Sequence, residues 1–290
     1  MNALLIGSFV WAQVLIPGKT PVQQFGIDDK GETVVTNSDN SSGIYGHGTF
    51  TPLPPPPASC ACQIGGIAVN DSGVVVGVAD PASGTGPRKG FILNGSTYTF
   101  FSRPGWDNTE PRGISNQGLV VGWSYSKDTT QSDGFIYDPS NGTFTDVTPG
   151  SGSPSIVQGI NRFGRIAGTF VQPSPRKLYG LVSQKNELSA FGATQVPFAQ
   201  QFQLGGAATR ARGINDFGIT VGFTDFGGTT NAFVGNDSWG YEIVVPPGGG
   251  TPQTFSICTG INNLGQVACS VTNADVTITL GLYIGTPGSP

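Results

Sequence analysis

The sequence has 290 residues, with 11% charged side chains and a formal net charge of −4. This balance excludes the basic surface that nucleic-acid-binding proteins use, and it excludes disorder driven by high net charge. The 45 Gly and 22 Pro residues indicate turns of an all-β protein, because Gly recurs at fixed places in short apolar runs. No window shows sustained 3.6-residue apolar spacing, so we expect almost no helix.

The chain begins with an apolar stretch, and we expect a strand from Phe9 onward. The first seven residues resemble the end of a signal peptide, but they lack a basic region and fall short of the usual ~15–30 residues. We therefore interpret them as mature sequence. Four Cys, one Met and a polarity carried by Ser, Thr, Asn and Gln are typical of secreted proteins, so we predict an extracellular location. No stretch approaches the ~18 apolar residues of a membrane span.

One short motif recurs six times along the chain. In its clearest copy, Gly213–Gly218, an apolar residue precedes an Asn and a Gly closes the segment. The other copies lie at 26–31, 68–73, 113–118, 159–164 and 260–265. Asn tolerates left-handed backbone and bonds its own turn, and Gly supplies positive φ, so the motif predicts a turn that sets strand register. A ring of these Asn side chains holding a cation or a sugar is the alternative.

The closing glycines are separated by 42, 45, 46, 54 and 47 residues, and each interval repeats the same apolar segments. A strand such as Val74–Gly77 follows the turn, then a second such as Gly90–Leu93, then a third. The third strands are expected at 50–53, 98–101, 144–147, 188–191 and 241–245. A Pro/Gly-rich loop leads into the fourth strand. Four antiparallel strands per unit of about 42–54 residues are the signature of a β-propeller blade. We predict one six-bladed propeller domain over 1–290.

The two ends of the chain complement each other. The last unit stops after Gly281–Ile284 and lacks a third-type strand, whereas Phe9–Ile16 is an unpaired strand of that type. We predict that residues 9–16 pair with 280–284 and complete the last blade, because closure removes exposed sheet edges. In one alternative, the hairpin between the second and third strands crosses between blades. In another, the N-terminal strand pairs with a neighbouring subunit and builds a homo-oligomer or filament.

The repeat unit also carries a family resemblance. A Phe-containing strand, Pro-Gly, Gly-Ile-Asn-x-x-Gly-x-Val-Val-Gly, a polar loop and Gly-Phe-Ile/Leu together resemble the HAF-type extracellular repeat of bacterial secreted proteins. The resemblance covers nearly the whole chain and implies a secreted propeller, and the family has no common activity to transfer. The His that gives the family its name is replaced here by Lys89, Asp133, Tyr179 and Asn231.

The four cysteines form two local pairs. Cys258 and Cys269 flank the last turn symmetrically, with Ile261 and Gln266 also placed opposite each other, so we predict a disulfide across a hairpin. Cys60 and Cys62 are separated by one residue and form either a local disulfide or two free thiols. Structural zinc needs four ligands and His47 is the only His in the chain, so we predict no metal site. We place His47 in an exposed hairpin turn, which leaves no catalytic triad.

Two loops are the best candidates for ligand binding. The segment 106–112 combines an aromatic with acids, an amide and an Arg, a mixture that polar-ligand sites use. The longest repeat carries an insertion at 199–207 in the same position, and insertions on one face of a repeat array often mark a binding face. The candidate ligand-binding residues are Trp106, Asp107, Glu110, Arg112, Arg210 and Arg212. The alternative is that Trp106 packs under its own loop.

These observations favour a secreted binding, adhesive or surface-assembly module. Its partners would be a polysaccharide, a cell surface or another protein, with no cofactor, nucleic acid or catalytic residue. The alternative is an extracellular carbohydrate-active hydrolase or lyase that uses rim-loop carboxylates. The acidic residues of the chain are few, and we expect them in solvated loops.

Overall fold

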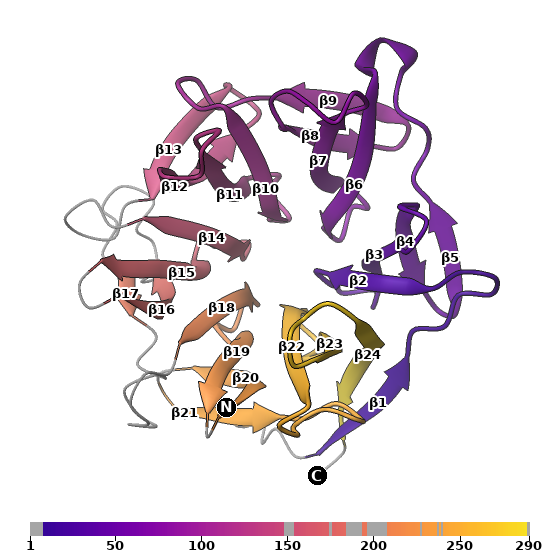
Figure 1. Cartoon of the computed structure of the whole chain (residues 1–290), viewed down its shortest axis with the longest axis vertical. Coiled ribbons are helices and arrows are strands. Elements are labelled where there is room, and N and C mark those ends of the chain that lie inside the picture. Colours follow the sequence, from indigo (N-terminus) through magenta and orange to yellow (C-terminus); the bar gives the residue numbers. More distant parts are fainter. Residues whose placement is uncertain are drawn as a thin grey trace.

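Six four-stranded antiparallel sheets surround a central axis in the computed structural model of the protein (Figure 1). The structure describes residues 8–147, 154–173, 176–183, 193–195, 208–226, 228–236, 238 and 240–288. The arrangement is a six-bladed β-propeller, as the repeat predicts. The expected third strand at 188–191 and the insertion at 199–207 lie outside the described residues.

Each blade runs outward from an innermost strand beside the axis. Blade 1 contains β2 (Pro21–Phe25), β3 (Thr33–Asn37), β4 (Ser42–Gly46) and β5 (Thr49–Pro52). Blade 2 contains β6 (Cys62–Val69), β7 (Val75–Pro81), β8 (Lys89–Asn94) and β9 (Thr97–Phe101), preceded by the 3-10 turn η1 (Ala58–Cys60). Blade 3 contains β10 (Asn108–Ile114), β11 (Val120–Tyr125), β12 (Ser132–Asp138) and β13 (Thr143–Val147).

The second half of the ring repeats this order. Blade 4 contains β14 (Ser155–Ile160), β15 (Ile166–Pro173), β16 (Arg176–Ser183) and β17 (Ala193–Gln195). Blade 5 contains β18 (Thr209–Ile214), β19 (Thr220–Phe226), β20 (Thr229–Asn236) and β21 (Gly240–Val244). Blade 6 contains β22 (Thr254–Ile261), β23 (Val267–Asn273) and β24 (Thr279–Pro287), and β1 (Phe9–Gln13) is its outer strand.

The N-terminal strand closes the ring. β1 pairs antiparallel with β24, with Trp11 opposite Gly285, and the Val14 amide donates to the Leu282 carbonyl at 2.8 Å. The side chains of Phe9 and Trp11 pack against the buried cluster of blades 5 and 6. The predicted closure is therefore confirmed, with a strand shorter than the predicted 9–16. The alternative of a hairpin crossing between blades is wrong, because the second and third strands of every unit pair within one sheet.

The repeated motif forms the turn between the innermost and second strands. In the copy at 213–218, the Asn215 Oδ1 atom accepts from the Phe217 and Ile219 amides at 3.1 and 2.9 Å. The closing Gly218 has φ of +76°, where an L side chain would be strained. The Asn and Gly therefore shape a turn, as the sequence predicts.

The same Asn side chains also join neighbouring blades. Each Nδ2 donates to the backbone carbonyl at the equivalent position of the next blade: Asn70 to Ser115 (3.1 Å), Asn161 to Asn215 (3.0 Å), Asn215 to Asn262 (3.1 Å) and Asn262 to Asp28 (2.7 Å). We call this set the carboxamide belt. The two substituted positions, Asp28 and Ser115, have no Nδ2, so the belt is interrupted after blades 1 and 3.

A second belt runs one residue later along the motif. Here a backbone amide donates to a side-chain oxygen of the next blade: Asp29 to Asp71 (2.8 Å), Asp71 to Asn116 (3.1 Å), Arg162 to Asp216 (2.9 Å), Asp216 to Asn263 (2.8 Å) and Asn263 to Asp29 (2.7 Å). We call this set the amide belt. It is interrupted only between blades 3 and 4, where Arg162 takes the acceptor position.

A β-bulge precedes the motif in blades 2 to 6. In blade 6, Cys258 lies opposite Cys269, but Gly260 lies opposite Ala268 and Ile261 opposite Val267. The predicted pairing of Ile261 with Gln266 is therefore wrong, because Thr259 is an extra residue on β22. The bulges leave one unpaired residue per innermost strand, in blade 3 between Pro111 and Gly113 and in blade 5 between Ala211 and Gly213.

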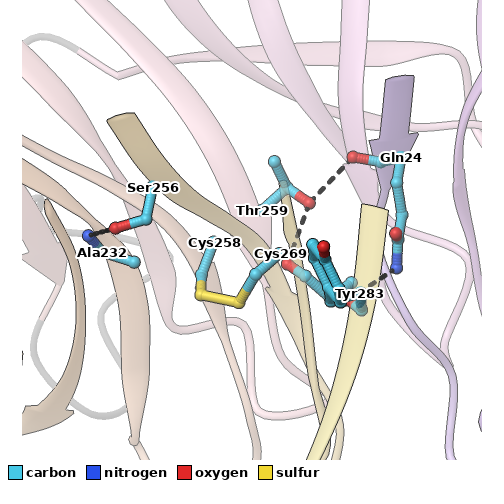
Figure 2. The surroundings of a disulfide bond; sticks show 8 residues. Gln24, Ala232, Ser256, Cys258, Thr259, Cys269 and Tyr283 are labelled. Atoms are coloured by element: carbon cyan, nitrogen blue, oxygen red, sulfur yellow. Dashed lines mark hydrogen bonds between the residues drawn. A yellow bond between two sulfur atoms is a disulfide. The ribbon is translucent and has the colours of Figure 1, made fainter. Parts of the chain in front are cut away.

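The Cys258–Cys269 disulfide joins β22 to β23 at the centre of blade 6 (Figure 2). Both cysteines are fully buried, and their Cα atoms are 4.0 Å apart. Blade 6 is also hydrogen-bonded to both neighbours beside this bridge. The Ala232 amide of blade 5 donates to Ser256 Oγ at 2.9 Å, and Thr259 Oγ1 donates to the Gln24 carbonyl of blade 1 at 2.9 Å.

The second disulfide links Cys60 to Cys62 at the start of β6 and spans a single residue, Ala61, which has φ of +46°. The structure thus selects the bridge over the two free thiols. His47 lies exposed in the β4–β5 turn, as predicted, with φ of +50°. In the described part of the chain, no helix is long and apolar enough to cross a membrane.

We predict that removing the longer disulfide lowers stability more than removing the shorter one. The double substitution Cys258→Ser/Cys269→Ser should cost about 3 kcal/mol of unfolding free energy, because the bridge closes a loop of about a dozen residues in the unfolded chain. Cys60→Ser/Cys62→Ser should cost about half as much, because its loop is much shorter. Urea denaturation of both variants measures the difference, and equal costs would contradict the prediction.

We predict that Asp28→Asn stabilises the ring. Asp28 Oδ2 is buried and has no hydrogen-bond partner among the residues that the structure describes, and burial, reinforced by the charges of Glu32 and Asp71, raises the pKa of Asp28 to about 6. The stability that protonated Asp28 contributes is complete below pH 4 and is lost as the pH rises through 6. An Asn at this position would donate to the Asn70 carbonyl and repair the carboxamide belt.

The expected gain for Asp28→Asn is about 2 kcal/mol at pH 7 and near zero at pH 4. Chemical denaturation across pH 4 to 8 measures it. A gain that did not change with pH would show that the ionisation of Asp28 is not its cause. Ser115→Asn fills the other interruption with no titratable group, so any gain that it brings should be independent of pH.

Candidate functional site

A cleft separates blades 1 and 2 at the rim opposite the repeated turns. Its volume is about 770 Å³. One side is formed by the segment Pro52–Pro56 and the loop 39–42 of blade 1, and the other by charged residues of blades 2 and 3. Four of these charged residues, Asp80, Arg88, Glu110 and Arg112, form a connected group that we call the charge network.

The charge network is built around two guanidinium groups that share one carboxylate. Arg88 binds both oxygens of Asp80, at 2.7 and 3.0 Å, and its Nη1 donates to Glu110 Oε2 at 2.8 Å. The other oxygen of Glu110 forms a close ion pair with Arg112. The side chain of Glu110 is 5% exposed, so this carboxylate is held inside the protein by its two cations.

These contacts also fix the protonation state of Arg88. Burial alone would lower its pKa, but the hydrogen bonds to Asp80 and the charge of Glu110 raise its pKa above the usual value. The backbone amide of Arg88 donates to Asn108 Oδ1 at 2.9 Å, which ties the β7–β8 loop to the start of β10. The network is therefore a fixed wall of the cleft, assembled from two blades.

One residue of each innermost strand lines the central channel. In blades 2 to 6 it is the extra residue of the β-bulge, and in blade 1 it is Phe25, which is paired with Val34. The residues at this position, which we call the throat residues, are Phe25, Ile67, Arg112, Gln158, Arg212 and Thr259. They line a narrow space of about 80 Å³. Phe25, Ile67 and Arg112 also line the cleft, so the cleft opens directly onto the throat.

Arg212 is the throat residue with the least compensated charge. Its Nη1 donates to Gln158 Oε1 at 3.0 Å, and its guanidinium carbon lies 5.3 Å from the centre of the Phe223 ring. Burial, together with the charges of Arg112 and Arg210, lowers its pKa to about 9. Within the described residues, no carboxylate forms an ion pair with Arg212.

The six predicted binding residues do not form one site in the structure. Glu110 and Arg112 line the cleft, and Arg112 and Arg212 line the throat. The guanidinium of Arg210 lies 5.2 Å from the Phe223 ring, which Arg212 also approaches, and burial lowers the pKa of Arg210. It lines neither the cleft nor the throat.

Trp106 and Asp107 also line neither space. The Trp106 ring lies 5.2 Å from the guanidinium of the buried Arg103, which is paired with Asp133 and Asp146. Asp107 Oδ2 accepts from the Lys127 amide at 2.9 Å. The contacts of Trp106 thus agree with the alternative that it packs on its own loop. The sequence pattern did not indicate Asp80, Arg88 or the proline segment as site residues, although the run of prolines at Pro54–Pro57 is conspicuous in the sequence.

The rim with the repeated turns has a smaller cavity and fewer free polar groups for a ligand than the cleft has. Its cavity of about 70 Å³ is lined by the two belts, and its Asn oxygens already accept backbone amides. The geometry therefore supports turn formation rather than a ring of cation ligands. Among the described residues, no group of three or more His, Cys, Asp or Glu side chains is arranged to hold a metal ion.

Structures of other proteins share this fold. A protein provisionally described as a gluconolactonase superposes with a TM-score of 0.53 at 12% identity, over 96% of this chain and 92% of its own. TolB from Acinetobacter baumannii gives 0.52 at 11%, over 93% and 63%. A puromycin-hydrolysing peptidase of Mycobacterium tuberculosis gives 0.50 at 11%, over 91% and 43%. These similarities establish the propeller fold alone. No family model and no curated protein sequence matches the chain.

We predict that Glu110→Gln destabilises the protein by about 3 kcal/mol, because it leaves the guanidiniums of Arg88 and Arg112 without their shared counter-charge. Urea denaturation at pH 7 measures the loss. Asp39→Asn, which breaks the exposed Lys19–Asp39 pair, is the matched control and should change stability little. A similar loss in both variants would mean that the burial of Glu110 does not matter.

Proposed function

We propose that this protein is an extracytoplasmic binding module that holds the end of a carbohydrate in the cleft between blades 1 and 2. The observation that carries the proposal is the cleft itself, about 770 Å³ in volume and lined by a charge network around the buried carboxylate of Glu110. Ligand sites are concave, and they combine apolar surface with a few fixed polar groups.

The lining of the cleft suits a sugar. Phe25, Leu53 and the prolines at 54–56 supply apolar surface on which C–H groups can pack. Exposed amides at Gln23 and Gln63 supply donors and acceptors, and the charge network supplies fixed charge. The wall from blades 2 and 3 belongs to β6 and to an ion-paired group, so little ordering of that wall is needed when a ligand binds.

The two disulfides indicate an oxidising compartment outside the cytoplasm. We propose that the chain is secreted and is a divergent member of the HAF-type repeat proteins. The support for this membership is that the motif occurs six times, once at the same position of each blade. Assembly by donation of the N-terminal strand is not part of the proposal, because β1 pairs within its own ring.

The alternative of a carbohydrate-active enzyme receives no support from the cleft. A hydrolase of the usual kind needs one carboxyl group that can donate a proton and a second that is free to act as nucleophile or base. Among the described residues, three carboxylates line the cleft. Guanidinium groups hold both oxygens of Asp80 and Glu110, and the oxygens of Asp39 accept from Lys19 and Ser41. We therefore propose binding without turnover.

A glycan-array screen followed by calorimetry tests the proposal. Gln63→Trp places a bulky ring in the cleft and should weaken binding of any hit by tenfold or more, a cost of about 1.4 kcal/mol or greater. Gln253→Trp makes the same change at an exposed position outside the cleft and should leave binding unchanged. An array without hits would refute carbohydrate binding, and unchanged affinity in Gln63→Trp would refute the cleft.

A further inference from the structure

The throat below the cleft carries an excess positive charge. The charge network and Arg212 together contain three guanidinium groups, those of Arg88, Arg112 and Arg212. They face two carboxylates, Asp80 and Glu110, so the difference is 3 − 2 = +1. The nearby Arg210 does not change this difference, because the charge of Asp225 acts on it in turn. The hydrogen-bond partner of Arg212 is the neutral Gln158, so the excess charge resides on Arg212.

The surroundings make this excess charge costly. The Nε atoms of Arg112 and Arg212 are both buried without a hydrogen-bond partner among the described residues. Phe25 and Ile67 add apolar surface to the same channel and screen the charge poorly. A buried cation without a counter-ion is unfavourable, whereas pairing it with an anion in the same enclosed space is strongly favourable.

The throat has enough free space for a small anion, and the cleft connects it to the outside of the protein. Its free space of about 80 Å³ is enough for several water molecules and therefore for a small ionised group. The cleft supplies the entrance, because three of the throat residues line both spaces. The Arg112–Glu110 pair shows that a guanidinium of the throat already accepts a carboxylate as its partner.

We propose that the throat is an anion site in which Arg212, with Arg112 and Gln158, binds one carboxylate group of a ligand. The excess of one charge matches a singly charged carboxylate better than phosphate, whose average negative charge at pH 7 exceeds one. A planar guanidinium binds a carboxylate through strong, charge-assisted hydrogen bonds. The site goes beyond the proposed function, because a carboxylate of any small ligand satisfies it and no sugar contact in the cleft is required.

Calorimetric titration at pH 7 and low ionic strength tests the site with three probes: sodium glucuronate, its neutral counterpart glucose, and inorganic phosphate. Glucuronate should bind at least tenfold more tightly than glucose, the factor expected of one charge-assisted hydrogen bond in an enclosed site. It should also bind more tightly than phosphate. Equal affinity for glucuronate and glucose, or preference for phosphate, would overturn the carboxylate assignment.

Arg212→Gln removes the excess charge and keeps a polar side chain beside Gln158. The variant should lose glucuronate binding by tenfold or more, while its unliganded form is at least as stable as the wild type, because a partly buried cation without a carboxylate partner has gone. Arg162→Gln makes the same substitution at an exposed Arg on the opposite rim and should bind like the wild type. A destabilised Arg212→Gln that still binds glucuronate would show that Arg212 has only a structural role.

The two proposals can fail separately. If the throat site is wrong and the cleft is right, neutral glycans bind to Arg212→Gln as to the wild type and are blocked by Gln63→Trp. If the cleft proposal is wrong and the throat is right, glucuronate and small carboxylates such as acetate bind in an Arg212-dependent manner, and no neutral glycan binds.

Discussion

The structure depends on how closely the six innermost strands approach one another around the channel. Glycines permit this approach: a Cβ atom on Gly260 would lie 2.7 Å from the backbone of Gly26, and one on Gly213 would lie 3.0 Å from the Cα of Gly260. At that spacing a carboxamide of one blade reaches the carbonyl of the next, which forms the carboxamide belt. The turn motif therefore has two roles, since it sets the register within a blade and joins adjacent blades.

Much of the fold could be predicted from the sequence because its signals are local and repeated. The turn is encoded by Asn and Gly within six residues, and the closure by a strand missing at one end and present at the other. The pairing of Cys258 with Cys269 followed from symmetry about the last turn. The pairing of Ile261 could not be predicted, because a bulge adds a residue without any composition signal at Thr259.

The candidate site was harder to predict because its parts come from three blades. Asp80 and Arg88 lie in blade 2 and its β7–β8 loop, whereas Glu110 and Arg112 lie in blade 3, and only the closed ring brings them together. Trp106 was predicted to bind a ligand because it is an aromatic residue among polar ones, yet its ring lies over Arg103. Sequence reasoning identifies residue types that can bind, whereas the bulge geometry decides which of them face the channel. That choice gives this propeller a cationic throat on a fold that proteins of several functions share.

Because the carboxamide belt is interrupted twice, its hydrogen bonds join some neighbouring blades and not others. Blades 4, 5, 6 and 1 are joined by successive Asn bonds and form one continuous arc, and blades 2 and 3 form a shorter one. Between blades 3 and 4, both belts are absent in the described chain, whereas between blades 1 and 2 the amide belt remains. The first boundary is therefore held by other contacts: Val121 and Val147 of blade 3 share a buried apolar cluster with Val157 of blade 4, and the Gly134 amide donates to Ser155 Oγ at 3.0 Å. The second boundary coincides with the cleft, and there the amide-belt bond is joined by a buried bond in which the Gly66 amide donates to Ser42 Oγ at 2.9 Å, so two blades without a carboxamide bond still hold the lining of the opening together.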